Sequence, residues 1–492
     1  MRLVLNGKIN SLYVQSLCMM FFRGEKFPEN EENPRGELIV TAIDNEDGIA
    51  CEATVIYDKK SSSAKCFTPF ENFEKYERAS KSAVGRAVYD ACVKLTGYIP
   101  PWGLLTGIRP SVVASELICA YGEERAIDLL KSRYALSHQK ASLAVEVAKN
   151  ENSILERYND DTCSLYVSIP FCPSRCSYCS FISYATSKLF RLIPSYIEKL
   201  LTDIDTTLDI IKQQNLKLVS VYVGGGTPTT LSSEQLERIL SKIYNYTKDI
   251  HPIEFTVEGG RPETITLDKL NVLKKYGVNR ISVNPQTLND DVLKCIGRHH
   301  TVEDFFCAYD LTKKAAFDVV NTDLIAGLDG DNIESFKSTV DKIIELEPEN
   351  ITVHSFSVKK SAQILKDDGD IYHKNGDFAK DSVDYAYNML ISCGYIPYYM
   401  YRQKNTVADL ENVGYAKSGA FGIYNVLMMG DRHTVFGVGA GATTKLVRKI
   451  NGKKEILRIF SPKYPYEYLQ DNQIEEKKII DFLKGGSNNE DN

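Results

Sequence analysis

The chain has 492 residues, a formal net charge of −6 and a pI near 5.8. This length exceeds one ordinary hydrophobic core, so two or three domains are expected. A composition of 43% hydrophobic and 25% charged residues is that of a globular protein in water. The acidic balance gives no electrostatic reason to expect binding to nucleic acid or to an anionic membrane.

The first residues do not resemble a secretory signal peptide, because Met1 to Ile9 contains charges and turns polar by Gly7. The apolar stretch Ser11 to Phe22 is too short to span a bilayer, so no membrane span is expected. Twelve cysteines in a chain this long, three of them clustered, do not read as a disulfide scaffold. We therefore expect a cytoplasmic protein in a reducing compartment.

The N-terminal part predicts a small α/β extension. A strand, a helix and a hairpin are followed by a serine-rich loop and a second helix. They are expected at Arg2–Leu5, Ser11–Phe22, Glu37–Ile43 with Gly48–Tyr57, Lys59–Lys65 and Asn72–Leu95.

The run Pro100 to Pro110 closes this module and carries the only tryptophan, Trp102. Two interpretations stay open for it: contact with a ligand or with a catalytic domain, and a packed loop with Trp102 as a core anchor. Ser111 to Asn150 is predicted helical, and a polar link from Glu151 to Asp161 follows.

The most informative motif follows the apolar run Leu165–Ile169, which is predicted to be a buried strand. Cys172, Cys176 and Cys179 come next in a C-x3-C-x2-C array. Three thiolates this close can hold three irons of a [4Fe–4S] cube and leave the fourth iron open to a substrate. The alternative is three unrelated cysteines, which need not stand at a strand end.

From Ser164 onward, apolar strand patterns alternate with helical patterns. Strands are predicted at 164–169, 218–223, 253–257, 279–283, 319–325 and 351–356, with helices at 187–214, 232–249, 266–276, 303–316 and 334–346. Six strand–helix units in series predict a parallel sheet with right-handed crossovers. The expected fold class is α/β, a partial (β/α)6 TIM-like barrel with an N-terminal α/β extension and a C-terminal α+β domain.

Distinctive residues follow the predicted strands, at the end where parallel barrels carry their chemistry. They are the Gly224–Pro228 loop, Glu258, Gln286, Arg298 and Asp323. The glycines allow close backbone approach, although such a run is more often a tight turn. Glu258 could equally be a solvated acid. The pair His299–His300 could suggest a metal site, but adjacent side chains point in different directions.

The cysteine spacing, Tyr178 before the last cysteine, and the run from Tyr166 to Cys172 resemble the radical S-adenosylmethionine (SAM) enzymes. Within them, the chain is most similar to the oxygen-independent coproporphyrinogen III oxidase-like family, in particular its HemZ-type branch. The resemblance implies a [4Fe–4S] cluster ligated by Cys172, Cys176 and Cys179, with SAM on the open iron. It also implies SAM contacts by Tyr166, Tyr178, Gly225, Gly226, Thr227, Glu258, Gln286, Arg298 and Asp323.

The resemblance implies a tetrapyrrole substrate, oxidative decarboxylation of two propionates to vinyls, and a reduced flavodoxin- or ferredoxin-type electron donor. Coproporphyrinogen dehydrogenases proper carry a fourth cysteine two residues after the third, where this chain has Phe181, and they lack so long an extension. Two alternatives therefore remain. One is a haem-binding chaperone or trafficking protein, and the other is a different radical SAM reaction on a tetrapyrrole, such as methylation or ring opening.

The region Pro397–Thr444 resembles the C-terminal half-motifs of the family, in which a glycine-rich strand end closes over the SAM and substrate cavity. Here that strand end is Gly437–Ala442. The predicted division is an extension at 1–155, a barrel at 160–360, a C-terminal domain at 361–484 and a disordered tail at 485–492.

Overall fold

The computed structural model of the chain describes residues 1–22, 25–27, 35–70, 76–107, 109–179, 187–357, 376–403, 406–471 and 475–485. These residues form two compact units. The first comprises Met1–Lys149 with Met400–Glu411, and the second Asn150–Tyr399 with Asn412–Asn492. Phe181, the start of the helix predicted from Asn72, and all but the first residue of the predicted tail lie outside the described residues. The predicted division into domains stays a prediction.

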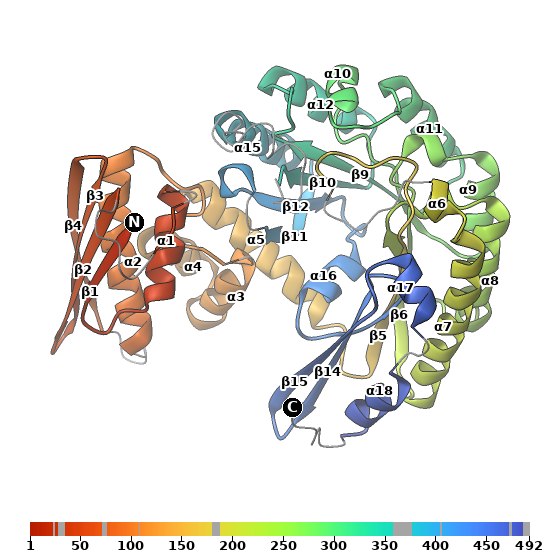
Figure 1. Cartoon of the computed structure of the whole chain (residues 1–492), viewed down its shortest axis with the longest axis horizontal. Helices are drawn as coiled ribbons and strands as arrows, with labels where there is room; N and C mark the ends of the chain where they lie inside the picture. The colour runs from red at the N-terminus through yellow and green to blue at the C-terminus, as the bar shows by residue number, and fades with distance from the viewer. Residues whose placement is uncertain are drawn as a thin grey trace. The chain divides into compact units, whose positions relative to one another are not determined.

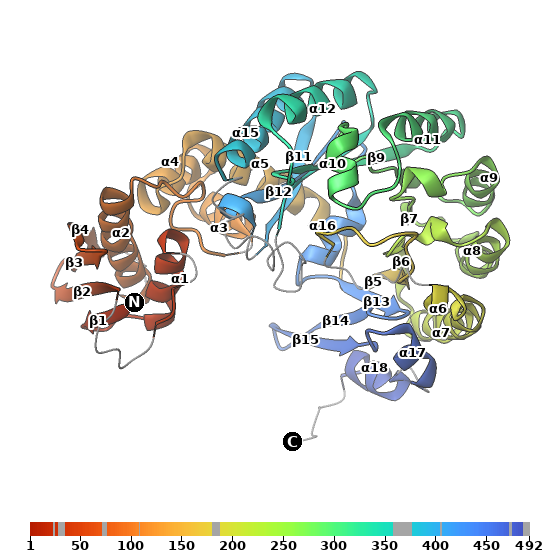
Figure 2. The ribbon, with the colours of Figure 1, turned by 45° about the horizontal axis from the view of Figure 1, so that its top comes forward.

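The first unit is a four-stranded sheet with helices packed on one face (Figures 1 and 2). The strands lie in the order β1 (Arg2–Asn6), β2 (Gly36–Asn45), β3 (Gly48–Tyr57) and β4 (Lys60–Pro69), with β1 parallel to β2 and the others antiparallel. The covering helices are α1 (Ser11–Phe21) and α2 (Tyr76–Thr96). Buried strand residues such as Val40 and Val55 share one hydrophobic core with buried alanines of α2, because only one face of each element is apolar.

The predicted loop Lys59–Lys65 is wrong, since this segment begins β4. Asp58 and Lys59 both have positive φ, 47° and 67°, which is the backbone that a two-residue hairpin turn requires. The three serines occupy an edge strand whose alternating positions are exposed, with Ala64 turned into the core. Because these serines are polar, the sequence pattern did not predict a strand here.

The predicted helical segment Ser111–Asn150 consists of three helices, α3 (Pro110–Tyr121), α4 (Glu123–Tyr134) and α5 (His138–Leu155). It breaks at Gly122 and Ala135, both of which have positive φ. Positive φ stops a right-handed helix, so these residues set the helix ends.

A buried polar cluster anchors the Trp102 run within the first unit. The Trp102 Nε1–H donates to Glu411 Oε2 over 2.7 Å, and Lys140 Nζ lies 2.6 Å from Glu411 Oε1. Arg402 stacks over the Trp102 ring, with 5.9 Å from Cζ to the ring centroid. Burial raises the pKa of Glu411, but the Lys140 ammonium outweighs it and holds that pKa below its usual value. Trp102 is therefore a core anchor with a satisfied N–H group.

The second unit contains the predicted parallel strands in one sheet. These are β5 (Thr162–Ile169), β6 (Lys217–Gly225), β7 (Glu254–Glu258), β8 (Arg280–Ser282), β9 (Val319–Ala326) and β10 (Asn350–Ser355). They are parallel neighbours in chain order. The connecting helices are α6 (Ser187–Phe190), α7 (Ile193–Gln213), α8 (Ser233–Thr247), α9 (Leu267–Lys275), α10 (Asp290–Cys295), α11 (Val302–Lys314) and α12 (Ile333–Glu345).

These helices lie along the outer side of the sheet (Figures 1 and 2). The predicted partial (β/α)6 TIM-like barrel is thus confirmed. Consecutive parallel strands place all their carboxyl ends at one edge of the sheet, so the loops that carry the predicted site residues gather there.

The C-terminal segment extends both ends of the same sheet. Its strands are β11 (Ile396–Arg402), β12 (Glu411–Ala416), β13 (Thr434–Val438), β14 (Thr443–Ile450) and β15 (Lys453–Phe460), and its helices are α15 (Gly376–Ser392), α16 (Ile423–Met429), α17 (Pro465–Gln470) and α18 (Glu476–Leu483). Strand β12 runs antiparallel beside β10, and β13 runs parallel beside β5. The order is β11-β12-β10-β9-β8-β7-β6-β5-β13-β14-β15.

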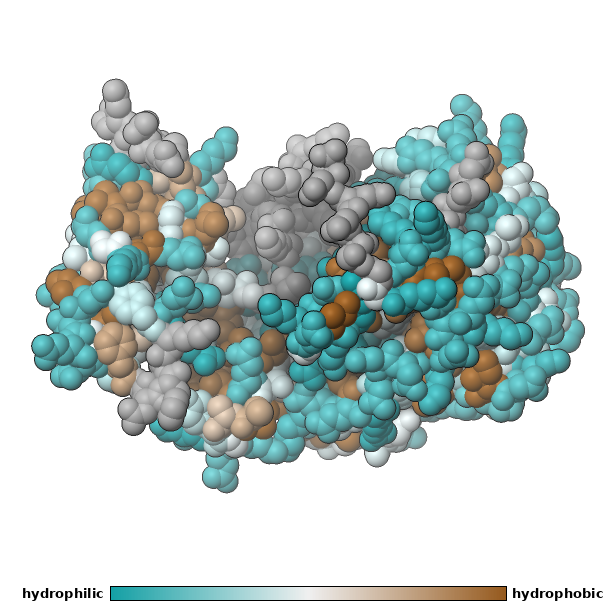
Figure 3. Space-filling view, turned by 90° about the horizontal axis from the view of Figure 1, so that it is seen from below, coloured by the Kyte–Doolittle hydropathy of each residue, from teal (hydrophilic) through white to brown (hydrophobic). Residues whose placement is uncertain are grey.

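The face drawn in Figure 3 is largely hydrophilic, with hydrophobic residues single or in small groups. In the part of the chain that the structure describes, every helix is too short or too polar to cross a membrane.

The cluster around Glu411 generates a stability prediction. Glu411→Gln removes the carboxylate partner of a buried ammonium, and breaking such a pair from one side should lower the free energy of unfolding by about 3 kcal/mol. Urea unfolding followed by fluorescence of Trp102, the only tryptophan, measures the change. The control is Glu52→Gln, which breaks the exposed Lys65–Glu52 pair and should cost less than about 0.5 kcal/mol. Equal unfolding midpoints for the two variants would contradict the prediction.

Candidate functional site

The cysteine loop follows directly from β5. Cys172 and Cys176 are only 7% and 8% exposed, and Cys179 is half-buried. The Cys179 N–H donates to the Cys176 carbonyl over 3.2 Å, which folds the last cysteines into a turn. Cys172 Sγ lies 3.3 Å from Thr227 Oγ1. The three thiols thus share one short loop at the carboxyl edge of the sheet.

Gly225 and Gly226 bring the end of β6 against the cysteine loop. The Gly226 N–H donates to the Ile169 carbonyl and the Thr227 N–H to the Phe171 carbonyl, each over 2.8 Å. A Cβ atom at Gly226 would lie 2.6 Å from the Phe171 oxygen, so any side chain there would collide with backbone. Gly225 has φ +107°, a conformation that favours glycine. The backbone at these glycines does approach another group closely, and in the protein that group is the cysteine loop.

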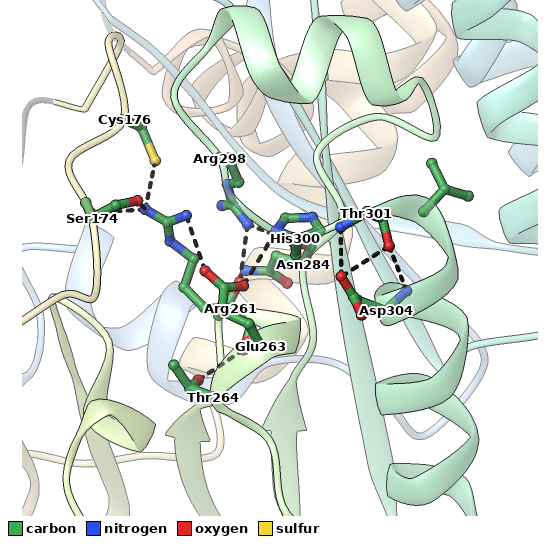
Figure 4. Close-up of polar contacts among 12 residues, drawn as sticks. Ser174, Cys176, Arg261, Glu263, Thr264, Asn284, Arg298, His300, Thr301 and Asp304 are labelled. Carbon is green, nitrogen blue, oxygen red and sulfur yellow. Dashed lines mark hydrogen bonds and ion pairs between the residues drawn. The ribbon is translucent and has the colours of Figure 1, made fainter.

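Arg298 is buried near the cysteine loop, and its guanidinium donates to two carbonyl groups and a hydroxyl group (Figure 4). Its Nη1 donates to the Asn284 carbonyl over 2.8 Å and to the Gly260 carbonyl over 3.2 Å, and its Nη2 donates to the Tyr178 hydroxyl over 3.2 Å. The buried Nε has no hydrogen-bond partner among the described residues. Arg298 was predicted to bind a carboxylate through two hydrogen bonds. Such binding would compete with the bonds of Nη1 and Nη2, so Nε is the donor that remains for a ligand.

Gln286 links the ends of two strands in a strained backbone. Its N–H donates to the Asp323 carbonyl over 3.1 Å, and its carbonyl accepts from the Ile325 N–H over 2.9 Å. Its φ is +70°, which costs a non-glycine residue about 1–3 kcal/mol. The buried side-chain Oε1 is without a partner among the described residues. A strained residue with an unsatisfied buried acceptor suits ligand binding better than packing.

Two partly exposed carboxyl groups, on the strands β7 and β9 that flank β8, have pKa values shifted in opposite directions. Glu258 accepts from the Tyr222 hydroxyl over 2.5 Å, and burial, with Asp323 nearby, raises its pKa to about 7. Burial also raises the pKa of Asp323, but His354, with Nε2 3.8 Å from Oδ2, outweighs it and lowers that pKa. Asn284 donates to Asp323 over 2.7 Å. Near neutral pH, Glu258 can therefore be neutral while Asp323 stays charged.

Three tyrosines stack beside Glu258. Tyr166 and Tyr222 have ring centroids 6.2 Å apart, and Tyr424, on α16, lies 4.5 Å from Tyr222 and 6.1 Å from Tyr166. Tyr166 was predicted from the sequence as a site residue, whereas Tyr222 and Tyr424 were not. The sequence signal for Tyr222 was its place two residues before Gly224 on β6. Residues two apart on a strand face the same side of the sheet.

The glycine-rich end of β13 lies against β5, while its predicted closure over a cavity stays a prediction. Ser168 Oγ donates to the Ala440 carbonyl over 2.7 Å, and the Ala440 N–H donates to the Tyr196 hydroxyl over 2.9 Å. A Cβ atom at Gly439 would lie 2.6 Å from the Ser168 carbonyl oxygen. The C-terminal segment therefore packs on the strand that leads into the cysteines.

Sequence reasoning missed a charged network next to the cysteines (Figure 4). Arg261 is 3% exposed at its side chain, and its Nη1 lies 3.4 Å from Glu263 Oε1. Glu263 Oε2 lies 3.3 Å from Nδ1 of the fully buried His300. The sequence did offer one signal for this network, because Arg261 comes three residues after Glu258, which was itself predicted to be a site residue. His299 is exposed while His300 is buried, which confirms that the two histidines point in different directions.

No three Cys, His, Asp or Glu side chains are grouped to hold a metal ion among the described residues. Cys172, Cys176 and Cys179 thus share one loop without forming a closed ligand set in that part of the chain.

Comparison with known proteins identifies the family. A family model described as the radical SAM superfamily matches residues 166–343. The oxygen-independent coproporphyrinogen-III oxidase-like protein HemZ of Bacillus subtilis (strain 168) is 32% identical to this chain, over 92% of the length of each. The chain belongs to this family of radical SAM proteins. The similarity to HemZ includes the N-terminal extension, as the resemblance in the sequence implied.

Two other relatives mark the breadth of the family. The heme chaperone HemW of Bacillus subtilis (strain 168) is 28% identical over 65% of this chain and 83% of that protein. The solved structure of coproporphyrinogen III oxidase (HemN) from Escherichia coli matches with a TM-score of 0.50 and 21% identity, over 66% of this chain and 71% of that chain. The latter supports the fold.

The cofactors of this radical SAM family are a [4Fe–4S] cluster and SAM. The residues present suit both. Three thiols on one loop are the donors that iron–sulfur clusters take, and one buried N–H group, from Arg261, points at the sulfur of Cys176. The unsatisfied Gln286 Oε1 and Arg298 Nε are an acceptor and a donor of the kinds that the polar groups of SAM could use.

Proposed function

We propose that this protein is a radical SAM enzyme that decarboxylates two propionate side chains of coproporphyrinogen III to vinyl groups without oxygen. The observation that carries the proposal is the 32% identity to an oxygen-independent coproporphyrinogen-III oxidase-like protein along 92% of both chains. The geometry supports it, since the thiol loop, the two unsatisfied polar atoms and the unequal carboxyl groups lie at one edge of the sheet.

Cys172, Cys176 and Cys179 would hold the cluster. When bound, the cluster and SAM supply a 5′-deoxyadenosyl radical that removes a hydrogen atom from the β-carbon of a propionate. Loss of CO2 and of one electron to an acceptor then leaves the vinyl group. A reduced flavodoxin- or ferredoxin-type protein is the proposed electron donor.

The other site residues would hold SAM. Glu258, as a carboxylate, would accept from the amino group of SAM, and Arg298 Nε would donate to its carboxylate. Gln286 Oε1 would accept from a ribose hydroxyl. Tyr166, Tyr178, Gly225, Gly226, Thr227 and Asp323 complete the proposed set, either at the strand ends or on the cysteine loop. Binding through buried groups excludes water from the reacting atoms, which suits radical chemistry.

A second candidate function is haem binding and transfer. Similarity to the heme chaperone HemW over 65% of this chain favours it, as does Phe181 in place of a fourth cysteine. This alternative keeps the same cofactors but removes the decarboxylation.

The product of an anaerobic incubation tests the function. Reconstituted protein with SAM, a reductant and coproporphyrinogen III should form the monovinyl intermediate and then protoporphyrinogen IX, with 5′-deoxyadenosine formed in step. Cys172→Ala, which lacks a proposed ligand, should form neither. Liquid chromatography with mass detection measures both products. Tight stoichiometric haem binding without any decarboxylated tetrapyrrole would replace the enzyme proposal with the carrier.

The pH dependence of SAM binding tests Glu258. Its pKa of about 7 means that the carboxylate, the better acceptor, forms between about pH 6 and 8. Because charge-assisted hydrogen bonds are about twice as strong as neutral ones, wild type should bind SAM about tenfold more tightly than Glu258→Gln at pH 8, and about equally at pH 6. Calorimetric titration of the anaerobic proteins measures this.

The difference between the two proteins isolates Glu258, because the amino group of SAM itself titrates equally in both experiments. Glu237→Gln, on the surface of α8, is the matched control and should follow wild type. Parallel pH profiles for wild type and Glu258→Gln would remove Glu258 from the proposed SAM site.

A further inference from the structure

Arg261 makes a direct contact with a proposed cluster ligand. It stands in the loop after β7, and its guanidinium is almost fully buried. One nitrogen, Nη2, donates to the Ser174 carbonyl over 2.8 Å, to Ser174 Oγ over 3.0 Å and to Cys176 Sγ over 3.2 Å (Figure 4). The same side chain thus holds the backbone of the cysteine loop and points an N–H group at a sulfur.

The position of the guanidinium is fixed from the other side. Nη1 pairs with Glu263, whose second oxygen lies against the buried His300. Ser174 Oγ also donates to the Gly297 carbonyl over 3.1 Å, and the Ser177 N–H donates to the Ile296 carbonyl over 3.0 Å. Since these contacts come from two separate loops, Arg261 cannot turn away from Cys176 without breaking several buried bonds.

A cationic N–H donor at a thiolate ligand affects the cluster in a defined direction. One-electron reduction adds a negative charge to the cluster. Hydrogen bonds to the sulfurs and nearby positive charge stabilise the reduced form more than the oxidised form, so they raise the reduction potential. The effect is large at a buried site, where solvent screening is weak.

We propose that Arg261 is a positioning residue that fixes Cys176 and raises the reduction potential of the cluster. The inference rests on the proposed assignment of Cys176 as a ligand. Its consequence is that a flavodoxin- or ferredoxin-type donor can reduce the cluster more readily. A lysine would keep the positive charge but not the planar fork of donors that serves Ser174, Cys176 and Glu263 together.

Redox titration of the reconstituted protein, followed by the EPR signal of the reduced cluster, tests the proposal. In Arg261→Gln, the equilibrium constant for one-electron reduction should fall about tenfold, which corresponds to a shift of about 59 mV to more negative potential. Arg261→Lys should show part of this shift. Ser174→Ala removes one oxygen partner but leaves the bond to Cys176, so its potential should stay at the wild-type value. Iron content is measured for every sample.

Each outcome decides the matter. An unchanged potential in iron-replete Arg261→Gln, or in iron-replete Arg261→Lys if the glutamine variant loses its iron, would overturn the proposal. Loss of the cluster from both variants with Ser174→Ala replete would overturn the proposed effect on the potential, because Arg261 would then act only by holding Cys176 and its loop. Failure of the ligand assignment is seen separately, as a full cluster in Cys176→Ala.

Discussion

Two buried arginines tie the cysteine loop to the ends of neighbouring strands, and the arrangement of the site depends on them. Arg261 holds Ser174 and Cys176, while Arg298 holds Tyr178 and the carbonyls of Gly260 and Asn284. A buried positive charge needs acceptors, and here backbone carbonyls, two hydroxyl groups, one sulfur and the Glu263 carboxylate supply them. The loop is thereby fixed by side chains from elsewhere in the sheet, although its own sequence has few apolar residues.

The two carboxyl groups near the site differ in their protonation. Glu258 and Asp323 are both only partly exposed, yet a histidine partner and amide donors keep Asp323 ionised while desolvation brings the pKa of Glu258 to about 7. A site that binds a zwitterionic ligand such as SAM benefits from this asymmetry, because one acid can respond to the ligand while the other stays charged.

The sequence predicted the regular parts of the molecule well. Alternating apolar runs and helical patterns located the parallel strands, since most positions of these strands are buried and several of the strands carry runs of apolar residues. The cysteine spacing and its flanking residues predicted the family and its cofactors. The serine strand β4 escaped prediction because an edge strand needs no apolar residues, and the union of β12 and β13 with the barrel sheet depends on pairings distant in sequence.

The roles of individual polar residues were harder to predict. Arg261, Glu263 and His300 are ordinary polar residues in sequence, and only the folding of three loops onto one another links them into a network that reaches Cys176 through Arg261. Arg298 was singled out by its position after a strand, but its partners could not be foreseen, because backbone carbonyls leave no trace in the sequence. The assignment of the SAM contacts stays a prediction.

The central claim is that three cysteines of one loop hold a cluster with an open iron, and iron and sulfide analysis after anaerobic reconstitution tests it most directly. Wild type and Cys163→Ala, in which a buried cysteine of β5 is changed, should each contain about four iron and four sulfide per chain. Cys172→Ala, Cys176→Ala and Cys179→Ala should each lose the cluster. A full cluster in Cys179→Ala, together with its loss in Cys163→Ala, would contradict the account.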